Sequence, residues 1–521
     1  MPKKKQPLSL ERLSLAAVGQ FVAHIGRIMI SPGSPISHEM PTQRPEYLQN
    51  TFQWLNELLY SSVPRSLFDK MATHILTSVS ELIKETKDSY SQDQPMWLFL
   101  NKMNIVVKLT EVAVNYHLRE MNISVWPKIM RHVLYQTLEK MTGLETLNLG
   151  SGSGGWKTSD FEKTVIQGIT AMKNLVSLCL CFDCTDHIIS IVANNCSRLR
   201  ILDVTSSRSV TDRSIPSLLN CQDLRQLLLY RTSVSIEGYA ELLVGLKNLR
   251  DLGRCDEFGT ILEHLRFSST YSHPLGLHIF QSRDVTTYHL NLLIEMCPCV
   301  RHVSIYHDER ISDLTVLAAL NDLRELKLMS CDFYTDHVKL LLEVKGQNLT
   351  WLHLEHVEEI DLNALIYISQ FCPNLKKLVF YNCDFLEHTS VSMKTLSVKP
   401  FQYLEYIMCV VDCALVHLEF LLSNCFNIKY IQLGSSTGIG DDTMAKVLSV
   451  NPMQKLEELK ILYSDNLSMH TVNLLMNHCD NLRVLSELES WQGISPAELQ
   501  QFREHLKNSN TDLDVRPTLS Y

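Results

Sequence analysis

Glycine and proline, the residues that most often interrupt regular structure, are scarce in this sequence. The 521 residues include 19 glycines and 17 prolines, too few for a low-complexity or collagen-like chain. Hydrophobic residues make up 45% and charged residues 20%, a balance that excludes global disorder. At about 150 residues per domain, the length allows roughly three or four domains.

The sequence also lacks a strong excess of one charge. Its 48 Lys and Arg against 57 Asp and Glu give a net charge of −9, without the basic character of a nucleic-acid binder. No apolar run of about 18 residues is evident, and no apolar stretch follows the first lysines as in a secretory signal. We therefore expect no nucleic-acid or membrane partner, and a cytoplasmic and/or nuclear location.

Leucine, by contrast, is abundant and regularly spaced. From Leu144 to Leu482 the template L-x-x-L-x-L recurs with an average interval of 26 residues. This is the period of a leucine-rich repeat, in which each unit supplies one short strand and one returning helix. Well-formed copies begin at Leu144, Leu175, Leu199, Leu224, Val300, Leu323, Leu349 and Leu375.

A single unit of this kind cannot bury its apolar face, so stacked units share one core and one parallel sheet. We predict an α/β leucine-rich repeat solenoid, a horseshoe of about 13–14 units over residues 142–490. Residues between the inward leucines should face the concave surface. The register blurs between residues 229 and 300.

The cysteines lack the pattern of a disulfide framework or of a zinc site. Their number is odd, 15, and neither the cluster Cys179, Cys181 and Cys184 nor the pair Cys297 and Cys299 has a matching partner pair. Several cysteines lie three positions before the first leucine of a unit. We predict that these pack as small buried hydrophobes, and we expect no metal and no cofactor. They are Cys196, Cys221, Cys297, Cys372, Cys425 and Cys479.

The remaining segments lie outside the repeats. Residues 1–7 are basic and are expected to be a disordered tip. Residues 8–141 show helical apolar spacing over 47–60, 64–84, 97–119 and 126–141 and are predicted to form an all-α module. Residues 491–521 are expected to provide a C-terminal capping helix and a tail.

The first predicted helix carries a recognisable motif. Residues 9–22, which begin Ser9-Leu10-Glu11-Arg12-Leu13-Ser14, resemble the BC box that docks on elongin C. Leu10 takes the leucine position of that motif, and Ser14 stands where the motif usually has cysteine. The resemblance implies an adaptor-binding set of Leu10, Leu13, Ser14, Ala17, Val18 and Phe21.

A second motif follows at residues 63–71. The segment from Val63 to Met71 is similar to the cullin box associated with cullin-2, with Pro64 suited to a first helical turn. The resemblance implies a cullin-binding set of Val63, Pro64, Leu67 and Met71. Alternatively, the same segment begins an F-box, which docks a Skp-type adaptor.

Together, the two motifs and the cysteine-containing repeats resemble Zyg-type and F-box/LRR-like substrate receptors of cullin-RING ubiquitin ligases. The resemblance implies a non-catalytic subunit that binds elongin B/C and a cullin-2-type scaffold, or a Skp-type adaptor and its cullin. A plain protein-interaction scaffold is the alternative without a ligase. No nucleophile and base recur at a spacing that indicates an enzyme.

The repeats would supply the substrate site. Aromatic residues at positions that alternate with inward leucines offer large contact area at low entropic cost. The predicted set is Tyr230, Tyr306, Trp351, His353, Tyr381, Tyr406 and Tyr430.

A glycine-rich segment, Gly150 to Gly154, offers a remote alternative. It follows a strand pattern as in a methyltransferase that binds S-adenosylmethionine. The acidic residue expected about 20 residues later is absent, because the next apolar strand ends near Asp183. A loop in the first repeat is the favoured interpretation.

Overall fold

The structure is a computed structural model, in which the chain forms two compact units. The first unit is Leu8–Gly253, and the second combines Met1–Pro7 with Arg254–Tyr521. The predicted boundary at residue 141 is therefore not a boundary between compact units. The structure describes residues 2–31, 45–90, 95–151, 158–268, 273–307, 310–386, 399–413, 415–434 and 438–518.

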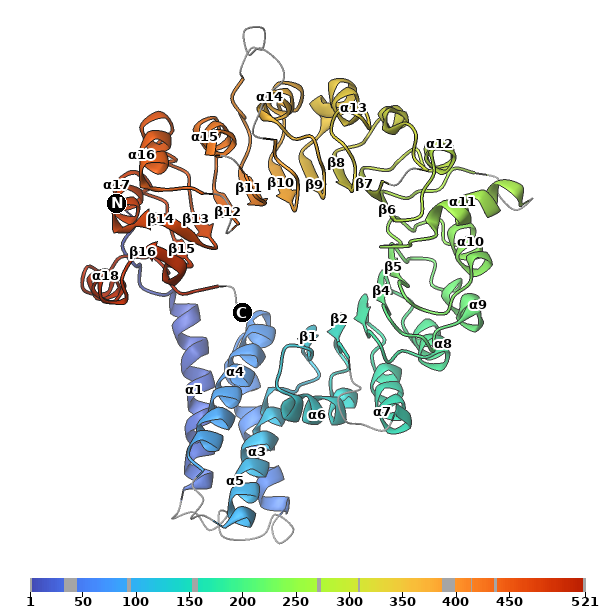
Figure 1. Cartoon of the computed structure of the whole chain (residues 1–521). Helices are drawn as coiled ribbons and strands as arrows, with labels where there is room; N and C mark the ends of the chain where they lie inside the picture. Colours follow the sequence, from blue (N-terminus) through green and yellow to red (C-terminus); the bar gives the residue numbers. More distant parts are fainter. Residues whose placement is uncertain are drawn as a thin grey trace. The chain divides into compact units, whose positions relative to one another are not determined.

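The first unit begins with a helical module (Figure 1). Two of its helices, α1 (Leu10–Ile30) and α4 (Phe68–Asp88), run parallel to each other. Their direction follows from two ion pairs: Glu11 contacts Lys70 near the helix starts, and Arg27 contacts Glu85 near the helix ends. Gly19 allows this close approach: a Cβ there would lie 2.7 Å from the carbonyl oxygen of His74. The elements are α1 (Leu10–Ile30), α3 (Pro45–Ser62), η1 (Arg65–Leu67), α4 (Phe68–Asp88), α5 (Met96–Lys108), η2 (Leu109–Ala113), α6 (Lys128–Gln136) and η3 (Leu138–Lys140).

The repeats of the first unit form a five-stranded parallel sheet in sequence order. Its first strand, β1 (Glu120–Asn122), lies inside the segment predicted to be all helical. Three residues are too few to show the alternation that identifies a strand in sequence. The other elements are β2 (Thr146–Asn148), α7 (Thr158–Ala171), β3 (Ser177–Cys179), α8 (Asp186–Asn195), β4 (Ile201–Asp203), η4 (Asp212–Ser214), α9 (Ile215–Leu218), β5 (Gln226–Leu228) and α10 (Ile236–Gly245).

The second unit contains a nine-stranded parallel sheet, again in sequence order, and a two-stranded sheet formed by β14 and β16. Its elements up to β10 are α11 (Phe258–Phe267), β6 (Ile279–Ser282), α12 (Thr287–Met296), β7 (His302–Tyr306), η5 (Leu314–Ala319), β8 (Glu325–Met329), α13 (Val338–Lys345), η6 (Gly346–Asn348), β9 (Trp351–Glu355), α14 (Leu362–Phe371) and β10 (Lys377–Tyr381). The later elements are β11 (Tyr406–Val410), α15 (Leu415–Ser423), β12 (Tyr430–Leu433), α16 (Asp441–Val450), β13 (Glu458–Ile461), β14 (Ser464–Ser468), α17 (Met469–His478), β15 (Val484–Ser486), η8 (Leu488–Ser490), β16 (Trp491–Gly493) and α18 (Pro496–Asn508).

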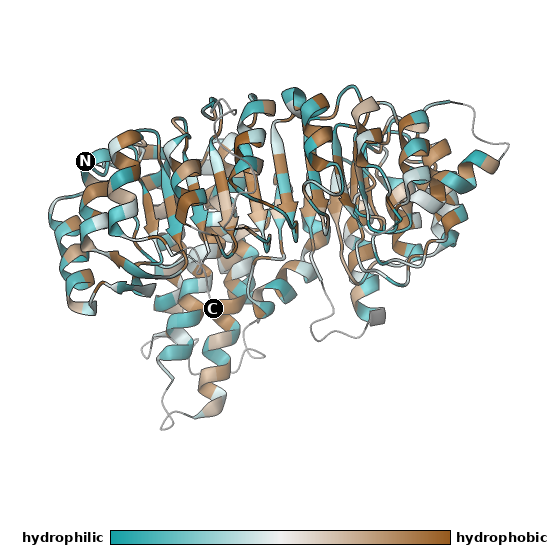
Figure 2. Ribbon diagram, turned by 45° about the horizontal axis from the view of Figure 1, so that its top comes forward, coloured by the Kyte–Doolittle hydropathy of each residue, from teal (hydrophilic) through white to brown (hydrophobic). Residues whose placement is uncertain are grey.

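The leucines of the repeat template form the core of both units, as predicted. Leu147, Leu178, Leu352 and Leu378 are all at most 1% exposed. Side chains between them turn to the other face of the sheet, so that apolar and polar residues alternate along the strands (Figure 2). The parallel sheets and their returning helices confirm the α/β repeat architecture. The horseshoe curvature of the whole chain stays a prediction.

The repeat cysteines also lie where they were predicted. Cys196, Cys297, Cys372 and Cys479 each follow the last residue of a helix, and their backbone N–H groups donate to the carbonyl four residues earlier. All four are fully buried or nearly so. Burial raises their pKa, which keeps the thiols neutral and unreactive at pH 7.

The region of blurred register coincides with the division between the two units. After Leu249 and Leu252 the third template position is Arg254 instead of an apolar residue. Gly253 has a φ of +66°, a conformation that does not continue a strand. Only an isolated bridge joins Asp251 to β5. The leucine ladder is thus interrupted at this point.

In the second unit, the first residues of the chain form backbone hydrogen bonds with residues near its C-terminus. Lys3 O accepts a hydrogen bond from Asp512 N at 2.7 Å, and Lys5 N donates to Asn510 O at 2.8 Å. The expectation of a disordered tip over residues 1–7 is therefore wrong for the described residues 2–7, because a few backbone hydrogen bonds fix this short segment. The capping helix appears as α18, which begins with a capping box at Ser495.

Helix α1 is the described segment whose length and composition suffice to cross a membrane, although no membrane span was predicted from the sequence. It has 21 residues, and one third of its most apolar window is buried inside the protein. Core helices and signal sequences pass the same test, so this property is weak evidence for a membrane span.

Carboxylates at helix starts connect neighbouring repeats. Asp186 accepts hydrogen bonds from the backbone N–H and the hydroxyl of Thr211 in the next unit, at 2.8 and 2.7 Å. Asp441 accepts from Ser468 N at 3.0 Å and from the Thr471 hydroxyl at 2.6 Å. Burial opposes ionisation of Asp441, but these hydrogen bonds bring its pKa below the ordinary value.

We predict that Asp441→Ala destabilises the second unit by about 1–3 kcal/mol at pH 7, because it leaves these donors unpaired. The lowered native pKa means that the carboxylate stabilises the fold above the unfolded value of about 3.9, and that this contribution disappears as the pH falls through the native pKa. Urea unfolding at pH 7 and below pH 4 measures both effects. Asp442→Ala, at an exposed neighbouring carboxylate, is the control, and equal destabilisation by the two variants contradicts the assignment.

Candidate functional site

The first candidate surface is one side of α1, here named the α1 outer face. Leu10 is 80% exposed, Leu13 48% and Phe21 39%. The opposite side of the helix, which includes Leu15 and Val22, is buried in the module. The helix therefore has two apolar sides: one packs inside the module, and the other is largely accessible to solvent. The outer face comprises the exposed residues Leu10, Leu13, Ser14, Ala17 and Phe21 and the half-buried Val18.

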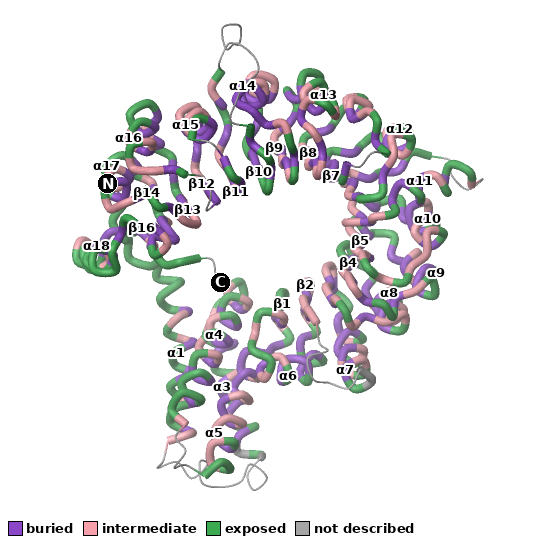
Figure 3. The backbone as a smooth tube through the Cα atoms, viewed as in Figure 1, coloured by how far each residue is buried: buried purple, intermediate pink, exposed green. Residues whose placement is uncertain are grey.

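The orientation of α1 about its axis is fixed by specific contacts. The Ser9 side chain caps the helix by accepting a hydrogen bond from Arg12 N at 3.2 Å. Two ion pairs with α4 flank the buried side: Glu11 with Lys70, and Arg27 with Glu85. Figure 3 shows much of α1 as exposed. The structure thus places all six residues of the predicted adaptor-binding set on one surface or at its edge.

The predicted cullin-binding set is only partly accessible. Pro64 is exposed, and Val63 and Leu67 are half-buried at the start of α4. Met71 is fully buried, so its assignment to the cullin contact is wrong. Met71 lies one helical turn before Ile75, and both belong to the side of α4 that packs inside the module.

Packing around Phe68 holds this segment in place. Phe68 is buried against Tyr60 in an edge-to-face contact, with ring centroids 4.7 Å apart. The Tyr60 hydroxyl donates to Ala113 O at 2.8 Å, and burial raises the pKa of this hydroxyl. Asp69 accepts hydrogen bonds from Arg119 N and Glu120 N, which joins α4 to the first strand of the repeats.

The second candidate surface is the side of the nine-stranded sheet that carries the outward side chains of β7 to β12, here named the aromatic face. Tyr306 and Tyr381 are 36% and 37% exposed. Four more residues of the predicted substrate set are half-buried on the same face: Trp351, His353, Tyr406 and Tyr430. Tyr230 follows β5 and belongs to the first unit, whereas the other six residues of the set belong to the second.

Neighbouring repeats place these rings in contact. Tyr406 pairs with Tyr430 in the sheet register, and their rings stack with centroids 4.7 Å apart and an interplanar angle of 13°. Trp351 lies between His302 and His353, at centroid distances of 5.3 and 6.1 Å. The contacts thus form two clusters of rings, one of Tyr406 and Tyr430 and one around Trp351.

Polar side chains on the aromatic face contact one another across strands. The Lys327 ammonium lies 2.5 Å from the Glu355 carboxylate, and His302 Nδ1 lies 2.9 Å from Glu325 Oε2. Burial and the Lys327 ammonium lower the pKa of His353 to about 4, so this imidazole is neutral at pH 7. The face therefore combines aromatic area with a lysine that is already paired with a carboxylate, which suits a protein ligand better than a polyanion.

A pocket of about 1210 Å³ opens at the carboxyl ends of β7 to β9. Arg283, His307, Asp332 and Glu358 are among its lining residues, and His307 lies 3.6 Å from Asp336. Sequence reasoning missed this pocket because its residues lie mostly in loops, where strand alternation no longer predicts the direction of a side chain. It extends the aromatic face through Tyr306.

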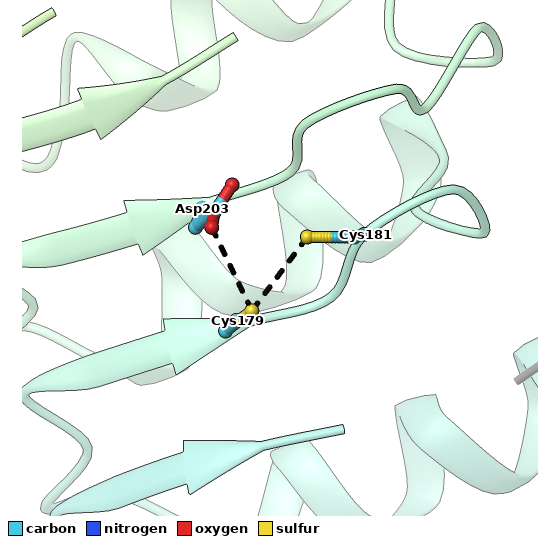
Figure 4. Close-up of side chains that lie close together, drawn as sticks. All are labelled: Cys179, Cys181 and Asp203. Carbon is cyan, nitrogen blue, oxygen red and sulfur yellow. Dashed lines mark hydrogen bonds between the residues drawn. The ribbon is translucent and has the colours of Figure 1, made fainter. Parts of the chain in front are cut away.

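A thiol–carboxylate cluster lies at the carboxyl end of β3 in the first unit. Cys179 Sγ lies 3.7 Å from Cys181 Sγ and 3.7 Å from Asp203 Oδ2 (Figure 4). Sequence reasoning considered Cys179, Cys181 and Cys184 together, but Cys184 is buried. Asp203 comes from the next repeat, and only the register of β3 and β4 reveals it.

The glycine-rich segment lies largely outside the described residues, which include Gly150 but not Gly152 or Gly154. In the described part of both main sheets the strand order follows the sequence without reversal. A dinucleotide or S-adenosylmethionine site of the doubly wound type uses a reversal of strand order. The topology therefore gives no support to the methyltransferase alternative.

Comparisons with known proteins give weak similarity only. No family model and no curated protein matches the chain. Among solved structures, a leucine-rich repeat protein of Leptospira interrogans is 15% identical, with 76% of this chain and 93% of that chain covered and a TM-score of 0.35. Rad7 and Elc1 from yeast, solved as a complex, give 12% identity, coverage of 89% and 95%, and a TM-score of 0.41. Neither similarity bears on what this chain binds.

We predict that Trp351→Ala leaves thermal stability nearly unchanged, because the ring lies on the sheet surface. Leu352→Ala, one position away in the core, should cost about 2–5 kcal/mol. Thermal and urea unfolding of the two variants measures the difference. If Trp351→Ala is as destabilising as Leu352→Ala, Trp351 is a core residue and the aromatic face is not a binding surface.

Proposed function

We propose that this protein is a non-catalytic substrate receptor of a cullin-RING ubiquitin ligase. The helical module would bind an elongin C-type adaptor, and the aromatic face would bind a protein substrate. The observation that carries the proposal is the α1 outer face: an exposed apolar stripe with BC-box spacing, on a helix whose opposite side is already packed.

The energetics favour a partner for this stripe. Burying one leucine side chain contributes about 1.5–3 kcal/mol. Leu10 leaves most of that contribution unused in the isolated chain, and Leu13 and Phe21 leave part of it unused. Contiguous exposed apolar residues are typical of interaction sites. Apolar residues three and four positions apart suit the insertion of a helix into a groove of the partner.

The proposed cullin contact lies at the same end of the module. The ion pair of 2.6 Å between Glu11 and Lys70 holds the start of α1 beside the start of α4, where Pro64 is exposed. An adaptor seated on Leu10 would therefore have Pro64 and Leu67 near its edge. This arrangement fits a scaffold that contacts the adaptor and the receptor together.

The F-box alternative fits this geometry less well. An F-box would offer the side of the segment with Leu67, Met71 and Ile75 to a Skp-type adaptor, but Met71 and Ile75 are fully buried in the module. A Skp-type adaptor would have to displace that packing. The plain scaffold remains the alternative without a ligase, and the adaptor experiment separates it from the receptor.

Leu10→Asp should abolish co-purification of elongins B and C, because it places a charge in an apolar contact. The measurement is affinity purification of the tagged full chain with identification of the adaptor and cullin. Leu340→Asp is the matched control, since Leu340 is an exposed leucine of a repeat helix, 43% accessible. If the wild-type chain retains neither an elongin nor a Skp-type adaptor, the ligase proposal fails and the scaffold stands.

A second variant distinguishes cullin recruitment from adaptor binding. Pro64→Ala combined with Leu67→Ala should weaken cullin recruitment while elongin binding persists. The same purification, followed by quantification of the cullin relative to elongin C, measures this. Loss of a Skp-type adaptor in this variant, together with a silent Leu10→Asp, would instead establish the F-box alternative.

A further inference from the structure

Cys179, Cys181 and Asp203 bring three metal-ligating side chains to one place. Cys179 and Cys181 are alternate residues at the carboxyl end of β3, and Asp203 is the register partner of Cys179 on β4. The three donor atoms lie within 4.8 Å of one another. Among the described residues, these three side chains form the cluster of histidine, cysteine or carboxylate groups that is compact enough to hold a metal ion.

These two cysteines differ from the others. Cys179 and Cys181 are half-buried, whereas twelve of the remaining thirteen are buried and Cys299 is exposed. Neither lies at the position before the first leucine where the repeat places a packing cysteine. Burial and the Asp203 carboxylate both raise the pKa of these thiols, so they are not poised as reactive thiolates.

We propose that Cys179, Cys181 and Asp203 form a binding site for a thiophilic divalent cation of the Zn²⁺ class. Tetrahedral coordination with Zn–S bonds of about 2.3 Å separates two sulfurs by about 3.8 Å, and a carboxylate oxygen at about 2.1 Å lies about 3.6 Å from each sulfur. The Cys179 Sγ–Cys181 Sγ and Cys179 Sγ–Asp203 Oδ2 distances are both 3.7 Å, and all three donor atoms lie within 4.8 Å of one another. The two distances from Cys179 thus match those of a coordinated ion.

Asp203 is already oriented for this role. Its Oδ1 accepts hydrogen bonds from Thr205 N at 3.0 Å and from the Thr205 hydroxyl at 2.6 Å. These bonds fix the carboxylate and leave Oδ2 directed at Cys179 (Figure 4). Such support of a ligand by its neighbours is typical of metal sites.

Three protein ligands leave one position for water or for a ligand from a partner. Binding releases two protons, one from each thiol, and transfers no electrons, and the cation offsets most of the resulting negative charge. Because its ligands come from β3 and β4, the ion would cross-link two neighbouring repeats. It would stabilise the first unit by mass action.

The test is a Co²⁺ titration of the reduced full chain, followed by absorption spectroscopy and competition with Zn²⁺. One equivalent of Co²⁺ should bind with a sulfur-to-cobalt charge-transfer band, and Zn²⁺ should displace it and raise the melting temperature. The double variant Cys179→Ser with Cys181→Ser should lose the band and at least about 100-fold in affinity. Cys299→Ser, at an exposed thiol elsewhere, should behave as wild type.

Asp203→Asn keeps both thiols and the shape of the site, so it tests the site even where the double variant fails to fold. We expect this variant to lose about tenfold or more in cobalt affinity. No saturable binding by the wild type, or an unchanged charge-transfer band in the folded double variant, would overturn the proposal. An unchanged cobalt affinity in Asp203→Asn would show that Asp203 is not a ligand of the ion. None of these outcomes depends on adaptor binding.

Discussion

In-register parallel pairing of short strands is the constraint on which the surfaces of this protein depend. Burial of the leucine template fixes which side chains point inward, and pairing then aligns equivalent outward residues of successive repeats. Cys179 meets Asp203 and Tyr406 meets Tyr430 for this reason, although 24 residues separate the members of each pair. The thiol–carboxylate cluster and the aromatic face are thus consequences of one register.

The helical module satisfies a different constraint. Gly19 and Gly26 let α1 approach its neighbours so closely that an added Cβ would lie within 2.7 Å of their atoms. Close packing buries one narrow side of the helix completely and leaves the other side available. The apolar stripe on that second side is only partly covered by the module, and Leu10 is 80% exposed. A partner therefore gives the simplest physical account of Leu10 and Phe21.

Sequence periodicity predicted the features that burial dictates: the inward leucines, the packing cysteines and the direction of rings such as Trp351. It misplaced Met71, because apolar spacing along α4 does not tell which side of a helix the rest of the fold will cover. It missed Asp203 because the contact joins separate repeats. It expected disorder in residues 1–7, because the pairing of Lys3 with Asp512 and of Lys5 with Asn510 is not visible in local composition.

The interruption at Gly253 and Arg254 separates the proposed activities. The α1 outer face and the thiol–carboxylate cluster belong to the first compact unit, and the aromatic face with its pocket belongs to the second. Each unit has its own sheet and its own leucine core. Substitutions at sites that share no partners act nearly independently. Under the proposed function, we therefore expect a change at Leu10 to leave the aromatic face intact and a change at Trp351 to leave the α1 outer face intact, as a receptor that joins two partners would require.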